Sequence, residues 1–332
     1  MTSSPLRRGV PIVIACFAAM IAAVIGAPFV GSTHLDFGRV FSWSIPFADN
    51  VDAQIFFVAR LPRALAGAFV GGALAAAGVV LQGLLRNPLA TPYTLGVSAG
   101  ASLGAMVAVT FGAKLPFGGV ATASLAGALL AVAIVYALAS ARHAGLSTMV
   151  LLLAGVTLNA FFSALILFVQ YSSDFAQAYR AIRWLMGDLD VGGYLPILAA
   201  LPFVLVAFAA FAWLARPLNL LSLGADAAEA RGIDVVRAQR VAFLSSSLAT
   251  GAAVSVGGPI GFVGIIVPHL VRLVVGADHR LVLPASTFFG AAFLVACDVA
   301  ARTVLAPLEL PVGVITAIIG GPFFLWLLLR KR

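Results

Sequence analysis

Very few residues of this chain have the type and spacing needed for catalysis or ion coupling. Its two lysines, Lys114 and Lys331, do not follow a glycine in a G-x-x-x-x-G-K-[ST] loop, so that nucleotide-binding motif is missing. Asp298 is the one acidic residue well inside an apolar stretch, and Arg302 follows it at the i, i+4 spacing of a helical ion pair. The sequence therefore predicts neither an ATP site nor a proton relay within this chain.

The histidines and cysteines are placed for structure rather than for metal chemistry. The four histidines fall in expected loops or at the ends of apolar stretches: His34, His143, His269 and His279. A single histidine without a second ligand at i+3 or i+4 is more often a structural hydrogen-bonding group. Cys16 and Cys297 fall inside apolar stretches and are expected to be small buried side chains. We expect no metal site, disulfide framework or bound cofactor.

The elements that must position these residues are membrane-spanning helices. Apolar residues make up 62% of the 332 positions and charged residues 10%, which leaves too little polar surface for a water-soluble globule. A hydrocarbon core about 30 Å thick requires about 20 apolar residues of helix. Eight such windows occur, near residues 10–30, 62–85, 93–112, 117–139, 147–170, 195–215, 281–301 and 311–329. The first is predicted to be a retained helix, because it is longer than the apolar part of a signal peptide.

A ninth apolar window, residues 241–271, forms either one long helix or two short ones. It contains no Asp, Glu, Lys or Arg, and the glycine- and proline-rich cluster at 255–261 interrupts it. Basic residues precede the first window and follow the last, so the positive-inside rule places both termini in the cytoplasm. Two cytoplasmic termini require an even number of crossings. We therefore predict an all-α membrane protein with ten transmembrane helices, two of them from this window.

A charged segment, residues 216–240, interrupts the apolar chain on the predicted cytoplasmic side. Its sequence is typical of two short helices, one over Asp226–Arg231 closed by Gly232, and one capped by Asp234 that continues into the next span. Such order exceeds what a solvated connector needs, which favours a docking surface for a partner chain. An ion-coupled secondary transporter or channel for a small solute is the alternative, but it would need buried carboxylates or a selectivity ring.

Four long stretches resemble the FecCD-type permease family, the membrane subunits of ATP-binding-cassette (ABC) importers for iron-siderophores, haem and cobalamin. They are "RLPRALAGAFVGGALAAAGVVLQGLLRNPLATPYTLGVSAGASLGA" (60–105), "LLLAGVTLNAFF" (151–162), "GFVGIIVPHLVRLVVGADHRLVLPAS" (261–286) and "ELPVGVITAIIGGPFFLWLL" (309–328). The resemblance implies a single permease domain over 1–332 in the bacterial inner membrane, and a homodimer around a central pathway. It also implies two cytoplasmic ATPase subunits, which hold ATP and Mg, and a periplasmic substrate-binding protein; nucleic acid is not expected as a partner.

The resemblance also implies roles for residues at three places. The segment 216–240 would supply the coupling elements that sit in a cleft of the ATPase: Leu223, Gly224, Glu229, Ala230, Arg231 and Gly232. Three outward-facing arginines would dock acidic residues of the binding protein: Arg60, Arg63 and Arg302. The cytoplasmic gate would comprise Asn87, Leu89, Ser147 and Thr148. This chain reads Ser-Thr-Met at 147–149, which leaves open which hydroxyl narrows the pore, and the inert pathway does not choose among haem, ferric siderophore and cobalamin.

Overall fold

Long apolar helices dominate the structure. The computed structural model describes residues 5–42, 44–112, 119–140 and 148–330, and these ranges contain helices and loops but no β-strand. Within these described ranges, six helices are long and apolar enough to cross a membrane by length and composition. They are α1 (Pro5–Gly26), α4 (Leu61–Leu85), α6 (Val120–Ser140), α7 (Thr148–Tyr171), α9 (Leu195–Leu221) and α13 (His279–Thr303). The predicted all-helical architecture is confirmed.

Four further helices lie beside these six: α5 (Val97–Phe111), α11 (Val235–Gly257), α12 (Val263–Val275) and α14 (Val312–Arg330). The ambiguous window therefore forms two helices, α11 and α12, separated at 258–262. Each predicted span coincides with one helix of the described chain, and that all ten cross the membrane stays a prediction. Among the shorter elements are α2 (Phe37–Val40), α3 (Val51–Gln54), the π-helix η3 (Ile55–Arg60), α8 (Phe175–Leu185) and α10 (Ala225–Glu229).

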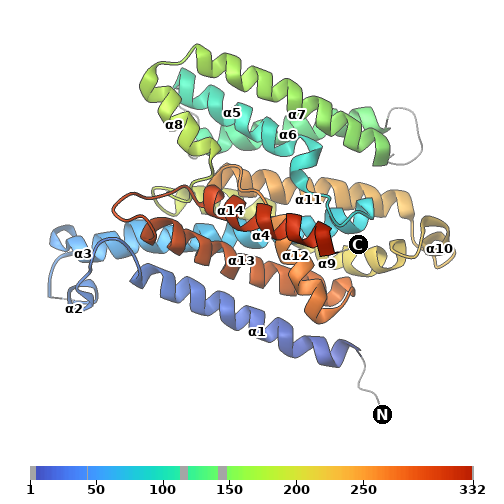
Figure 1. Cartoon of the computed structure of the whole chain (residues 1–332), viewed down its shortest axis with the longest axis horizontal. Coiled ribbons are helices and arrows are strands. Elements are labelled where there is room, and N and C mark those ends of the chain that lie inside the picture. Colours follow the sequence, from blue (N-terminus) through green and yellow to red (C-terminus); the bar gives the residue numbers. More distant parts are fainter. Residues whose placement is uncertain (1–4, 43, 113–118, 141–147, 331–332) are drawn as a thin grey trace.

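Helix α4 is the centre of the molecule. Every residue from Val70 to Gln82 is buried, and α9, α11, α12 and α13 pack around it (Figure 1). Small residues make this possible, because a glycine lets two helix backbones approach closely. A Cβ atom at Gly78 would lie only 2.8 Å from the carbonyl carbon of Gly264 on α12. The long run of Ala and Gly in α4 is therefore a packing requirement of the fold.

A second group of helices, α5, α6 and α7, packs against α11, while α1 lies along α13 on the other side of the molecule (Figure 1). Contact between α5 and α6 again depends on glycine, since a Cβ at Gly100 would lie 2.7 Å from Ala131. Helix α7 is exposed along much of its length, with Leu153 and Phe168 both more than 60% exposed. This group therefore presents an apolar face that the rest of the chain does not cover.

The two ends of the helix bundle carry different elements. Figure 1 shows the start of α1, the end of α14 and α10 at one end, and α2, α3 and α8 at the other. We call these the α10 end and the α8 end. The common placement of α10 with the ends of α1 and α14 agrees with the arrangement predicted from the charge pattern.

Candidate functional site

A short polar elbow, residues 222–234, joins α9 to α11 at the α10 end. Helix α10 ends at Glu229, two residues before the predicted end at Arg231. Gly232 follows in a turn with a left-handed backbone (φ +80°), and its N–H donates to the carbonyl of Glu229 at 2.8 Å. Asp234 then caps α11 by accepting a hydrogen bond from the Arg237 N–H at 2.9 Å. The predicted cap at Asp234 is confirmed, and the first predicted helix exists but is shorter at its C-terminal end.

The elbow is shorter than the charged segment 216–240 from which it was predicted. Residues 216–221 continue α9 past the predicted end at 215, and residues 235–240 are the first turns of α11. The last turns of α9 are stabilised because Leu218 and Leu221 are buried in the core. The prediction from charged residues therefore made the connector between α9 and α11 too long.

Most of the predicted coupling residues are exposed at this elbow. Leu223 is 63% exposed, an unusual position for a leucine outside the apolar helix faces. Glu229, Ala230, Arg231 and Gly232 are also exposed, while Gly224 is half-buried. The buried Ala228 anchors α10 to its neighbours. The arrangement provides a small, ordered surface with one apolar and two charged side chains available to a partner.

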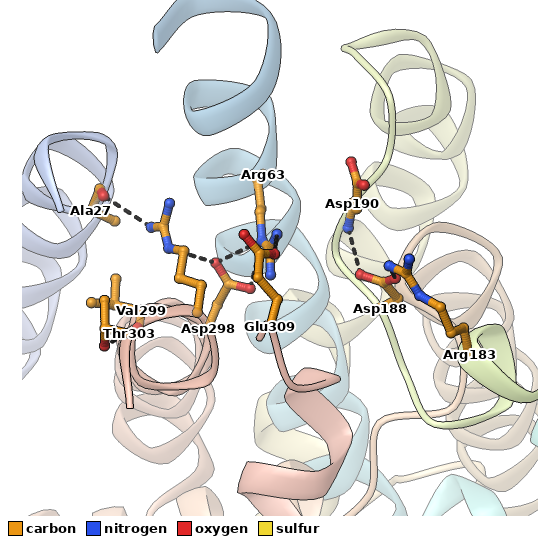
Figure 2. A network of polar contacts seen from close by, with 10 residues as sticks. Ala27, Arg63, Arg183, Asp188, Asp190, Asp298, Val299, Thr303 and Glu309 are labelled. Atoms are coloured by element: carbon orange, nitrogen blue, oxygen red, sulfur yellow. Dashed lines mark hydrogen bonds and ion pairs between the residues drawn. The ribbon is translucent and has the colours of Figure 1, made fainter. Parts of the chain in front are cut away.

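An ion network ties helices together at the α8 end (Figure 2). The guanidinium of Arg63 on α4 donates from Nε to both carboxylate oxygens of Asp298 on α13, at 2.9 and 3.1 Å. Its Nη1 donates to Oε2 of Glu309, in the loop before α14, at 2.6 Å. Arg302 completes the group through an ion pair of 3.6 Å between its Nε and Oδ2 of Asp298. The expected Asp298–Arg302 pair exists, but Arg63 is the closer partner.

Arg60 and Arg302 do not face outward, contrary to the expectation from their positions at span ends. Arg60 is 7% exposed and donates to the carbonyl oxygens of Pro28 and Thr33. Arg302 is 3% exposed and donates to the carbonyl of Ala27 at 2.9 Å. Both therefore hold the loop after α1, because unpaired carbonyls at the end of a helix need donors. A docking role for the three arginines stays a prediction, and Arg63 is the one that reaches the rim through Glu309.

A second ion pair lies near the first network (Figure 2). Arg183, on the amphipathic helix α8, donates to Oδ2 of Asp188 at 2.5 Å. This hydrogen bond raises the pKa of the Arg183 guanidinium, which is charged in any case. Oδ1 of Asp188 accepts the Asp190 N–H at 3.0 Å and so orders the turn that follows α8. The pair thus fixes how α8 joins the rest of the α8 end.

Two of the four predicted gate residues, Asn87 and Leu89, lie in the non-helical segment 86–91, which precedes the short 3-10 helix η4 (Pro92–Leu95) and α5. Asn87 accepts the Leu89 N–H on Oδ1 at 2.9 Å, and both side chains are exposed at the α10 end. The two prolines of "RNPLATP" prevent a continuous helix here. Thr148 is the first residue of α7, and Ser147 lies outside the described residues. Whether these groups form a gate stays a prediction.

Two residues that the sequence interpretation did not single out hold this segment in place. Tyr93 donates from its hydroxyl to the carbonyl of Ile260, in the break between α11 and α12, at 2.6 Å. Asn159 on α7 donates to the carbonyl of Tyr93 at 2.8 Å. Non-helical backbone at membrane depth is tolerated where protein satisfies its polar groups, so these bonds stabilise both helix breaks. Asn159 is the isolated asparagine in the apolar stretch "LLLAGVTLNAFF", and this polar residue was the one feature of the sequence that could have indicated such a contact.

A hollow of about 490 Å³ beside Asn159 has unusually polar walls for an apolar bundle. It lies between α5 and α7 and is lined by hydroxyl and amide side chains in addition to apolar ones. The polar lining residues are Tyr93, Ser98, Ser102, Asn159, Ser163 and Gln170. Such groups offer weak, uncharged hydrogen bonds rather than a tight binding site. This surface is suited to a solute that must pass without being held.

Nothing in the described residues forms a metal centre, since they contain no group of three or more His, Cys, Asp or Glu side chains that could hold an ion. The densest polar cluster at the α10 end joins α9 to α13. Asn219 donates to Oδ1 of Asp278 at 2.7 Å and accepts the His279 N–H at 2.8 Å. Arg280, which donates to the Asp278 carboxylate, holds the pKa of that carboxyl well below its usual range. The cluster caps the N-terminus of α13 and joins it to α9.

Comparisons with known proteins match nearly the whole chain. The model of the FecCD transport family matches residues 18–330. The cobalamin import system permease protein of Halobacterium salinarum is 47% identical over 269 residues, which cover 81% of this chain and 72% of that protein. The hemin transport system permease protein of Yersinia pestis is 38% identical over 317 residues, covering 94% and 93% of the two chains.

A solved structure is similar over the same extent. It is an inward-facing structure of a protein described as a metal-chelate type ABC transporter, with a TM-score of 0.81 and 32% sequence identity. The match covers 98% of this chain and all of that one. The arrangement of helices around α4 is therefore shared with a transporter of known fold.

Proposed function

Because this chain belongs to the FecCD transport family of ABC-transporter permeases, we propose that it moves a metal chelate across the bacterial inner membrane into the cytoplasm. The chain is a multi-pass membrane protein and a transport subunit rather than an enzyme. We propose that two copies form a homodimer around a central pathway, with ten crossings each and both termini cytoplasmic. Two ATPase subunits would dock at the α10 end, and a periplasmic binding protein at the α8 end.

The observation that carries this proposal is the exposed elbow on α10. A chain without a nucleotide-binding loop that moves a solute uphill must receive work from a partner, and a protein interface needs an ordered surface to do so. The elbow is ordered by Gly232 and Asp234, yet it leaves Leu223, Glu229 and Arg231 exposed. Closure of the ATPases would push on these residues and shift α9 and α11, which continue directly from the elbow.

The dimer and its pathway are proposed from the uncovered faces of α7 and α14. Apolar side chains stand exposed on both helices, among them Leu153 and Phe161 on α7 and Ile318 and Leu325 on α14. A second copy would cover part of this surface, and the polar hollow beside Asn159 would face the pathway. The non-helical segment with Asn87 and Leu89 would close its cytoplasmic end, together with Ser147 and Thr148.

The proposed cargo is cobalamin, haem or an iron chelate. Two relatives are named for cobalamin and hemin import, and the similar structure is described as a metal-chelate type transporter. All three cargo classes are bulky and partly polar, which agrees with weak, uncharged pathway walls. Discrimination among them belongs mainly to the binding protein, which would meet the α8 end near Arg60, Arg63 and Arg302.

The test is uptake by the reconstituted complex. The permease is placed in vesicles with its own ATPase and binding protein, and accumulation of cobalamin, haem and a ferric siderophore is measured with and without ATP. The proposal expects ATP-dependent accumulation of one of the three, lost in a binding-protein-free control. Accumulation of a small solute driven by a proton or sodium gradient, without the ATPase, would overturn it.

A further inference from the structure

A large groove between α9 and α13 is not used by any of the roles described so far. Its volume is about 700 Å³, and most of its lining is apolar or aromatic. Its lining includes Phe208, Phe211, Arg216, Arg280, Leu283 and Phe288. Phe17 of α1 packs edge-on against Phe288 at a centroid distance of 5.1 Å, so α1 borders one side. The groove therefore lies along the side of the helix bundle, between helices long enough to span the membrane, and not on the α10 end or the α8 end.

The groove has a basic end and an apolar end. Arg216 and Arg280 lie where α9 finishes and α13 begins, at the α10 end, whereas Phe208 and Thr287 lie deeper (Figure 1). Eight residues of helix separate Phe208 from Arg216, which is about 12 Å at 1.5 Å per residue. That length matches the step from a headgroup region into the hydrocarbon.

The charge at the basic end is positive and partly uncompensated. Arg280 is paired with Asp278 at 2.6 Å, but the exposed Arg216 makes no ion pair or hydrogen bond within the described chain. The guanidinium of Arg237 lies 5.7 Å from the ring centre of Trp213. Arg216 and Arg280 therefore line the mouth of the groove, and the lining residue Trp213 is in turn contacted by a third arginine, Arg237 on α11. A tryptophan is favoured at the membrane–water interface.

The mouth is also rigid, because the cluster of Asn219, Asp278 and His279 ties α9 to α13 beside it. His279 is 7% exposed, and its ring nitrogen Nδ1 lies 2.7 Å from Oδ1 of Asn219. Two further hydrogen bonds join the helices here: the Asn219 amide donates to the Asp278 carboxylate, and the His279 backbone N–H donates to Oδ1 of Asn219. A preformed mouth loses little entropy when a ligand enters it.

A second groove on the same helix serves as an internal comparison. It has a volume of about 410 Å³, lies between α6 and α9, and has no charged residue among its lining residues. Both grooves are apolar enough to accept lipid chains, but only the α9–α13 groove adds cations at one end. The combination of an apolar slot with cations at its membrane-surface end is what an anionic lipid requires.

We propose that the α9–α13 groove binds one anionic phospholipid from the leaflet at the α10 end. One acyl chain lies along Phe208, Phe211 and Leu283, and the phosphate lies beside Arg216 with Arg280 as a second donor. This site is independent of the transported cargo. It places a lipid against the helix that leads directly into the elbow.

Trp213 provides the readout, because brominated acyl chains quench indole fluorescence on contact. The experiment uses a variant in which the other three tryptophans are replaced, Trp43→Phe, Trp184→Phe and Trp326→Phe, reconstituted in phosphatidylcholine vesicles. Quenching is titrated with brominated phosphatidylglycerol and with brominated phosphatidylcholine of the same chains. The proposal expects a preference for phosphatidylglycerol of about fivefold or more, which corresponds to about 1 kcal/mol for one basic residue near an anionic headgroup.

Variants of one exposed side chain separate the proposal from general surface charge. Arg216→Gln should bring the preference down about fivefold without affecting folding, because this exposed side chain makes no ion pair or hydrogen bond within the described chain, and Arg216→Lys should restore most of it. The matched control is Arg86→Gln, which removes another exposed arginine from the α10 end but does not line this groove. Arg280→Gln should have a smaller effect than Arg216→Gln, since Asp278 already offsets its charge.

Three outcomes would overturn the proposal. Equal quenching by the two brominated lipids would show that the groove does not select an anionic headgroup. Absence of quenching by either lipid would mean that another protein segment covers the groove. Loss of the preference on addition of millimolar inorganic phosphate, compared with chloride at the same ionic strength, would mean that the mouth binds a soluble anion and not a lipid.

Discussion

The two ends of the molecule use their charged residues in opposite ways. At the α10 end, Glu229 at the end of α10 and Arg231 in the following turn stand exposed. At the α8 end, Arg60, Arg302 and Asp298 are almost fully buried and bind elements far apart in the sequence. One end leaves these charges exposed, whereas the other uses them to hold the loop after α1, α4 and α13 together.

The difference matters because burial changes what a mutation measures. An exposed charge in water can be reversed at little cost to folding, so its loss reports on contacts with other chains. A buried charge whose partner is removed has neither a counter-ion nor water around it. Mutation of the partner therefore lowers mainly the stability of the fold. The comparison between the two ends is tested by changes that should affect stability at one end and coupling at the other.

The largest effect is expected from Asp298→Asn. This change leaves the guanidinium of Arg63 without its buried carboxylate partner and Arg302 without its ion pair, both in a buried environment. Removing one member of a buried ion pair costs about 3–5 kcal/mol. Denaturant unfolding of the purified protein in detergent measures the change.

The matched control for Asp298→Asn is Glu309→Gln, because Glu309 binds the same Arg63 but is 45% exposed. Its removal should cost about 0–1 kcal/mol, as for other exposed pairs. Equal stability of Asp298→Asn and the unmodified protein would show that the network is not a structural clamp.

The next effect is expected at the elbow. Arg231→Glu should reduce transport and binding-protein-stimulated ATP hydrolysis by about tenfold or more, because reversing a charge in a desolvated interface costs on the order of 2 kcal/mol. Folding should be unaffected, since Arg231 is exposed and its one internal bond is to the carbonyl of Ala227. The measurement is uptake and ATPase activity of the reconstituted complex.

Asp226→Asn is the control for the elbow, because it alters an exposed charge on α10 outside the proposed coupling set. It should leave transport within about twofold of the unmodified complex, as expected for a surface position away from the interface. If the Arg231→Glu complex transports at the wild-type rate, the elbow does not couple the ATPase to transport and only connects α9 to α11.

How well the sequence predicted these features depends on whether they are local. The turn at Gly232 and the cap at Asp234 follow from residues within one turn, and both were predicted, although α10 itself ends earlier, at Glu229. The break within residues 241–271 also has a local cause, because Gly258 adopts φ +68° and Pro259 cannot donate a backbone hydrogen bond. The local pattern left one or two helices open there, and the even number of crossings decided for two. Local signals need no knowledge of the fold.

Features that depend on distant parts of the chain were not predicted. Arg63 and Asp298 are 235 positions apart, and only the packing of α4 on α13 brings them together. The same holds for Tyr93 and Ile260, which join two helix breaks 167 positions apart. Periodicity locates a helix and its polar residues, but it does not say which helix lies opposite.

A moderate effect is expected at the proposed gate. Cysteines introduced at Asn87 and Leu89, in a background lacking Cys16 and Cys297, should react with a membrane-impermeant thiol reagent applied from the cytoplasmic side. Both positions are exposed in the single chain. If they close a pathway between two copies, ATP should change the reaction rate severalfold, since access to a thiol controls its reactivity. The same rate with and without ATP would place the gate elsewhere.

The smallest effect concerns docking at the α8 end, where Arg63 divides its donors between Asp298 and Glu309. Glu309→Gln frees Nη1 of Arg63 and removes one negative charge near an acidic partner surface. The complex with the binding protein should therefore tighten by about two- to fivefold at low salt, which corresponds to about 0.5–1 kcal/mol for an exposed charge contact.

The gain from Glu309→Gln should disappear above about 0.1 M salt, where the screening length falls to about 10 Å. Asp49→Asn is the control for net charge, because Asp49 is exposed at the same end but lies outside the network. If Glu309→Gln tightens binding more than Asp49→Asn, the freed arginine contacts the partner. If Glu309→Gln weakens binding instead, the carboxylate of Glu309 is itself the contact, and the arginines serve only to hold the helices beneath it.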